Sequence, residues 1–194
     1  MRKINVLSVP ALILLFCNSL SKTSDENEWP ANQLLKNGAV TSTIDNDAQR
    51  LFNPAHLFTK EVAEKILGEP AHLDDSATIV NKDAVQYKSS YIAIAKDPKT
   101  GKTGGVYYLF ERYNNATTAH EVYDSFKDGN QSQEGFSILH GMGDEAYYHS
   151  DGENFHLIIV RKGKNMFRIK VNKITSNTSL EQFKTVAKNI TAEL

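Results

Sequence analysis

The architecture of this chain is organised around the stretch Gly141-Met142-Gly143-Asp144-Glu145-Ala146-Tyr147-Tyr148. Its two glycines are typical of a tight turn or bulge, because glycine adopts positive φ without a steric penalty. The turn follows the strand-like segment 136–139 and precedes two further strands, so it predicts antiparallel pairing in the C-terminal half. It does not predict a phosphate loop, since a third glycine and a strand–turn–helix setting are missing.

The strands after this turn are separated by short polar turns at 151–154 and 162–165. The last strand alternates, with one set predicted to face inward and the other to face water: Phe167, Ile169 and Val171 against Arg168, Lys170 and Asn172. Because neighbours on a strand point to opposite faces, Asp144 and Glu145 are not expected to share one substrate.

The remainder of the chain supplies helices and one earlier hairpin. Thr59 is expected to begin a helix that ends at Gly68, and residues 74–83 are expected to form a loop. Strands are predicted at 87–95 and 106–110, and helices at 119–127 and 180–194. The fold class is therefore α+β: an antiparallel sheet of about five strands with helices packed on one face, in the order helix-β-β-helix-β-β-β-helix.

Composition limits the function classes. The 194 residues carry a formal net charge of −1, which does not favour nucleic acid as a partner. The single cysteine, Cys17, excludes an intrachain disulfide framework. We expect one α+β domain at 55–194, preceded by a polar tether and a weakly ordered lead-in at 18–54.

The first residues predict export. Met1-Arg2-Lys3 is positively charged, and the apolar run 6–16 is shorter than the roughly 20 residues that span a bilayer. Leu14-Leu15-Phe16-Cys17 resembles a bacterial lipoprotein signal, which implies a signal peptide at 1–17 and lipidation of Cys17, although Phe16 stands where a small residue is usual. Cleavage after Ser21, giving a soluble periplasmic or secreted protein, is the alternative.

The eight tyrosines suggest a binding surface. Tyrosine brings a large apolar area with a polar hydroxyl, so a sheet face with Tyr108 and Tyr148 is our hypothesis for ligand binding. The lone tryptophan, Trp29, is a further candidate for stacking on a ligand. Packing in the core is the alternative for all three residues.

Evidence for catalysis is weaker. His140, His149 and His156 could meet across adjacent strands and hold zinc or copper, with chance placement on strand surfaces as the alternative. No nucleophile motif occurs, and the only cysteine lies in the signal. We therefore assign no catalytic residue, no cofactor and no metal site from the sequence.

The segments 141–147, 155–171 and 180–194 together are similar to small exported bacterial lipoproteins of unassigned function. Asp75-Ser76-Ala77 looks like the short O-glycosylation site of exported Bacteroidetes proteins. The resemblance implies an envelope location and a membrane anchor through lipid on Cys17. The expected function is a non-enzymatic binding module for an envelope protein or small ligand. The alternative is a metal-dependent or hydrolytic periplasmic enzyme with its site near 141–156.

Overall fold

The computed structural model describes residues 53–194. The predictions for the signal peptide, Cys17, Trp29 and nearly all of the tether lie outside these residues. Asn53 accepts a hydrogen bond from the Ala55 amide and caps a short 3-10 helix, η2 (Pro54–Leu57).

The described residues contain helices and strands in a mixed order. The helices are η2 (Pro54–Leu57), α2 (Lys60–Leu67), α3 (Ala116–Asn130) and α4 (Leu180–Glu193). The strands are β1 (Ala71–Val80), β2 (Ala84–Ala93), β3 (Gly105–Tyr113), β4 (Ser137–Ile138), β5 (Glu145–Ser150), β6 (Phe155–Lys162) and β7 (Asn165–Asn172). None of these helices is both long and apolar enough to cross a membrane.

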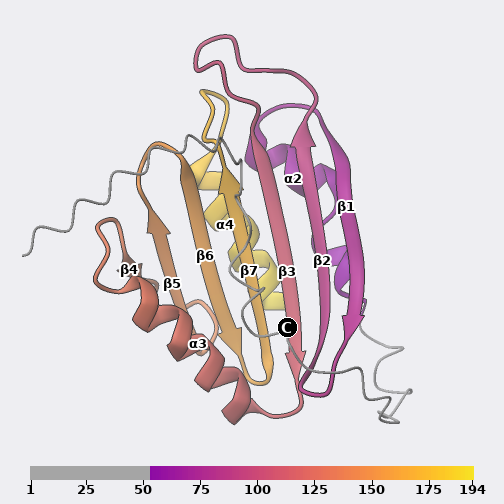
Figure 1. Cartoon of the computed structure of the whole chain (residues 1–194), viewed down its shortest axis with the longest axis vertical. Helices are drawn as coiled ribbons and strands as arrows, with labels where there is room; N and C mark the ends of the chain where they lie inside the picture. The colour runs from indigo at the N-terminus through magenta and orange to yellow at the C-terminus, as the bar shows by residue number, and fades with distance from the viewer. Residues whose placement is uncertain (1–52) are drawn as a thin grey trace, which may run out of the picture. The chain divides into compact units, whose positions relative to one another are not determined.

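The strands form one antiparallel sheet in the order β1-β2-β3-β7-β6-β5-β4 (Figure 1). The α+β class and the antiparallel pairing are confirmed, but the sheet has seven strands where about five were predicted. The largest difference is β1, which occupies most of the segment expected to be a loop. Asp74, Asp75 and Ser76 are poor strand formers, yet an exposed edge strand tolerates them because it has little core to pack.

The helices cover both faces of the sheet, so the prediction of helices on one face is wrong. In Figure 1, α2 and α4 lie behind the sheet and α3 lies in front of it. The connectivity explains this placement, since α3 is the crossover from β3, next to the central strand β7, to the edge strand β4. It packs against β3, β6 and β7 on the way.

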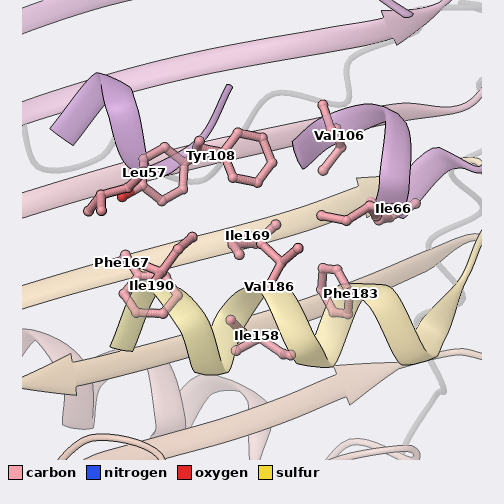
Figure 2. Packing of buried hydrophobic residues seen from close by; sticks show 14 of the residues in the cluster. Leu57, Ile66, Val106, Tyr108, Ile158, Phe167, Ile169, Phe183, Val186 and Ile190 are labelled. Carbon is pink, nitrogen blue, oxygen red and sulfur yellow. The ribbon is translucent and has the colours of Figure 1, made fainter. Parts of the chain in front are cut away.

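The main core lies between the sheet and the two rear helices. Figure 2 shows Phe183, Val186 and Ile190 of α4 facing Ile158 and other residues of the central strands. Beside them the Phe58 ring stacks on Tyr108, with 4.8 Å between ring centroids. Ser179 begins α4 by accepting a hydrogen bond from the Gln182 amide.

A second, smaller core lies under α3. It joins Tyr123 of the helix to Tyr147, Ile159 and Met166 of the sheet. Arg168 also lies on this side, and only 2% of it is exposed, so the prediction that it faces water is wrong. Alternation placed Arg168 on the correct face, but the sequence did not show that a helix covers that face.

Candidate functional site

The turn at Gly141–Gly143 is built as the sequence predicts. Gly141 and Gly143 have φ of 74° and 67°, and Met142 between them inserts its side chain into the main core. A Cβ on Gly143 would lie 2.5 Å from the Arg161 carbonyl oxygen, whereas one on Gly141 would meet nothing within 4 Å. The turn therefore holds β5 tightly against β6 at this end of the sheet.

Arg161 joins the two carboxylates that follow the turn. Its Nη1 lies 3.0 Å from Asp144 Oδ2, and its Nε donates to Glu145 Oε2. Both carboxylates reach Arg161 although they are neighbours in the sequence, because Asp144 precedes the first residue of β5 and strand alternation does not apply to it. Asp144 also accepts the Gly163 amide at 2.7 Å, which fixes the neighbouring hairpin.

A cluster that sequence reasoning missed lies where α3 meets β5. His120 Nδ1 is 2.9 Å from Glu145 Oε2, and its Nε2 is 3.3 Å from Asp124 Oδ2. Among the described residues, these three form the group of ligand-type side chains close enough to hold a metal ion. The available signal was the His120-x-x-x-Asp124 spacing, which places both side chains on one side of a helix.

The electrostatics of this cluster are largely balanced by the protein itself. Burial opposes ionisation of Glu145, but hydrogen bonds from Arg161 and His120 outweigh it and hold its pKa below the usual range. The hydrogen bond from Lys127, at 2.7 Å, lowers the pKa of Asp124. Because both carboxylates already have cationic partners, a divalent cation would compete with existing ion pairs.

The three histidines considered as metal ligands do not converge. His149 lies opposite Leu157 and His156 opposite Ser150, so the two imidazoles are on different faces of the sheet. His149 Nδ1 contacts Asn130 Oδ1 at 3.0 Å on the α3 side. His140 lies in the turn before Gly141, at a shallow hollow of about 220 Å³. The structure does not bring these three histidines together.

His156 belongs to a hydrogen-bonded group on the rear face. Its Nδ1 lies 2.9 Å from the Tyr148 hydroxyl and 3.0 Å from Ser150 Oγ. Burial lowers the pKa of the imidazole, which favours its neutral form. Ser150 Oγ donates instead to the Phe155 carbonyl at 2.6 Å, so it is not poised as a nucleophile.

The two tyrosines proposed to bind ligand face the rear helices. Tyr108 is 1% exposed and packs in the main core, and burial raises the pKa of its hydroxyl well above the usual range. Tyr148 is half-buried beneath the Lys184 ammonium, which lies 5.0 Å from its ring centroid. Neither residue lies on a sheet face left open by the helices.

The open part of the sheet lies on the opposite face, beyond the end of α3. We call it the open half-face and define it by Lys88, Ile92, Tyr107, Leu109 and Lys170. The strand registers place all five side chains on this face, across β2, β3 and β7. No described helix covers it (Figure 1). It presents partly exposed apolar side chains together with two lysines.

Lys170 distinguishes this surface from an ordinary solvated sheet. Its ammonium lies 5.7 Å from the Phe155 ring centroid, and burial lowers its pKa. Within residues 53–194 no carboxylate pairs with it, whereas Lys88 is paired with Asp75 at 2.7 Å. A partly desolvated cation beside apolar side chains fits a surface that a partner can cover.

Comparisons with protein-family models, with curated proteins and with solved structures found no match.

Proposed function

We propose that this protein is an exported, lipid-anchored envelope protein that acts without catalysis by binding another protein through the open half-face. Residues 1–17 support export, because a short apolar run follows a positive start and ends at the only cysteine. Lipid chains on Cys17 would contribute about 0.8 kcal/mol of membrane affinity per buried CH₂ group.

The observation that carries the binding function is the combination of Tyr107, Leu109 and Lys170 on a face without a covering helix. Partner surfaces are recognised by apolar and aromatic contact, with charge complementarity setting orientation. Because Lys170 has no carboxylate partner among the described residues, the proposed partner surface is apolar with an acidic group placed against it.

Binding is tested by cross-linking the full-length protein in native membranes and identifying the attached protein by mass spectrometry. Leu109→Asp places a charge in the open half-face, whereas Ile138→Asp changes a residue that is 46% exposed on β4, at the other edge of the sheet. The same cross-linked protein should be captured by the wild type and by Ile138→Asp, and lost with Leu109→Asp. If a folded Leu109→Asp variant still captures it, the open half-face is not the binding surface.

Export and anchoring are tested separately by mass spectrometry of the mature N-terminus. A chain that begins at a lipidated Cys17 supports the anchored form. A chain that begins after Ser21 supports a soluble exported protein, and an intact chain beginning at Met1 contradicts export.

The second candidate function is a metal-dependent enzyme, and the specific observation that favours it is the His120–Asp124–Glu145 cluster. Its ion pairs with Lys127 and Arg161 weigh against metal binding. Titration calorimetry with Zn²⁺ on the wild type and on Glu145→Gln decides between the two. Stoichiometric binding that is lost in Glu145→Gln would favour the enzyme.

A further inference from the structure

The two edges of the sheet differ in how they are protected. Natural sheets block edge strands by shortness, bulges, proline or charged side chains, because an open edge pairs readily with another strand. The edge strand β4 has two residues, whereas β1 has ten. A bulge between Leu73 and Asp75 interrupts the first part of β1. The next six residues, Asp75–Val80, run in regular register and contain none of these blocking features apart from Asp75.

The turn after β1 determines which backbone groups point outward. The Asn81 amide donates to the Ala84 carbonyl at 3.0 Å, so Asn81 bonds toward β2. Because this direction alternates along an antiparallel strand, Ala77 and Ile79 also bond toward β2. The N–H and C=O groups of Ser76, Thr78 and Val80 therefore point away from the sheet. No strand within residues 53–194 lies on that side.

We infer that a second copy of this chain pairs with β1 in an antiparallel manner, with Thr78 opposite Thr78 on a two-fold axis. A two-fold axis perpendicular to the sheet leaves the same face of both copies on the same side. Residues that lie opposite each other across the two β1 strands must therefore have side chains on the same face. With the axis at Thr78, Ser76 of each copy lies opposite Val80 of the other copy, and about six backbone hydrogen bonds form between the strands. Centring on Ala77 would instead place Val80 against the bulge at Asp74.

The side chains are self-complementary in this register. Val80, 61% exposed, would lie across from Ser76, and Ile79, 36% exposed, across from Ala77. The acidic pair at 74–75 would lie beside Asn81 and the exposed Lys82 of the second copy, so like charges are not opposed. This complementarity selects a second copy as the occupant over a foreign strand. The pairing uses the edge and does not depend on the open half-face.

Cysteine cross-linking tests the register in the full-length Cys17→Ser chain. The chain is produced in a host that does not glycosylate Ser76, because a glycan there would block the edge of β1. Opposed residues of a hydrogen-bonded pair are about 5.5 Å apart at Cα, which suits a disulfide. Thr78→Cys should give a covalent dimer under mild oxidation. Its control, Ala77→Cys, should give no covalent dimer, because the two Ala77 positions lie diagonally about 7–8 Å apart in this register. Equal or stronger cross-linking of Ala77→Cys would overturn the register.

Thr78→Pro tests whether the backbone carries the interaction. Proline removes an outward N–H and is tolerated on an edge strand, whereas the control Thr78→Val keeps both the N–H and the branched shape. Light scattering should show dimers for the wild type and Thr78→Val, and a dimer dissociation constant raised about tenfold or more for Thr78→Pro. A wild type that is still monomeric at about 100 μM, or a Thr78→Pro dimer as tight as the Thr78→Val dimer, would overturn the proposal.

Discussion

Replacing Arg168 by leucine tests how much the buried Arg168–Glu111 ion pair beneath α3 contributes to the stability of the fold. Arg168 Nη2 lies 2.7 Å from Glu111 Oε2, and the two side chains are only 2% and 4% exposed. The guanidinium lies 4.4 Å from the Phe126 ring centroid, and Gln86 Nε2 donates to the other Glu111 oxygen at 2.8 Å. Arg168→Leu removes the cation and leaves the Glu111 carboxylate buried.

Breaking a buried ion pair by removing one partner typically costs about 3–5 kcal/mol. We expect about 3 kcal/mol for Arg168→Leu, at the lower end because Gln86 still donates to Glu111. A domain is stable by about 5–15 kcal/mol, so the variant should fold but be visibly weakened. The double variant Glu111→Leu/Arg168→Leu should recover most of this loss, since no charge is then buried.

Urea unfolding measures the effect. With an m-value of about 2 kcal/mol/M, the expected loss lowers the midpoint by about 1.5 M. The control is Lys88→Ala at the exposed Lys88–Asp75 pair, whose side chains are 45% and 54% exposed and which should change stability by about 1 kcal/mol or less. An Arg168→Leu variant as stable as this control, or a double variant no more stable than Arg168→Leu alone, would refute the reasoning.

Three further outcomes are expected from the turns and caps. Gly143→Ala should destabilise the fold by more than Gly141→Ala in thermal unfolding, because both have positive φ but only Gly143 would clash with the Arg161 carbonyl; equal losses would contradict the close approach. Hydrogen bonds, above all the one from the Ser176 amide, hold the pKa of Asp97 well below its usual range. The ionised carboxylate therefore stabilises the fold above about pH 4, and this stabilisation is lost as the pH falls toward the pKa of the folded state. Asp97→Asn should therefore flatten the acid dependence of unfolding, and an unchanged profile would count against it. Ser179→Ala should cost about 1 kcal/mol by removing the cap of α4, measured by urea unfolding.

The tyrosine pair on β3 shows where prediction of the candidate surface failed. Tyr107 and Tyr108 are adjacent, so a strand places one on each face of the sheet. The sequence offered Tyr108, which the rear helices bury, whereas Tyr107 lies on the open half-face. Both neighbours are aromatic and fit a buried position equally well. The choice of face depended on where α3 crosses the sheet, which no local pattern records.

The His120–Asp124–Glu145 cluster was not predicted from the sequence, for a related reason. His120 and Asp124 share one helix at a visible spacing, but Glu145 follows a turn 21 residues after Asp124 in the sequence. Their approach requires α3 to pack at the start of β5. The histidines that looked adjacent along the sequence, His149 and His156, were separated to opposite faces by the register of β5 and β6.

The sequence by itself determined the α+β class, the hairpins and the final helix, because alternation, turn glycines and the apolar stripe of a helix are local properties. The prediction of an N-terminal export signal also comes from the sequence alone, since it depends on composition. Only the tertiary structure decided the number of strands, the faces of the helices and the side chains left open. Those depend on which strand lies at an edge and on where a crossover helix lies, and both are set by packing between segments far apart in the chain.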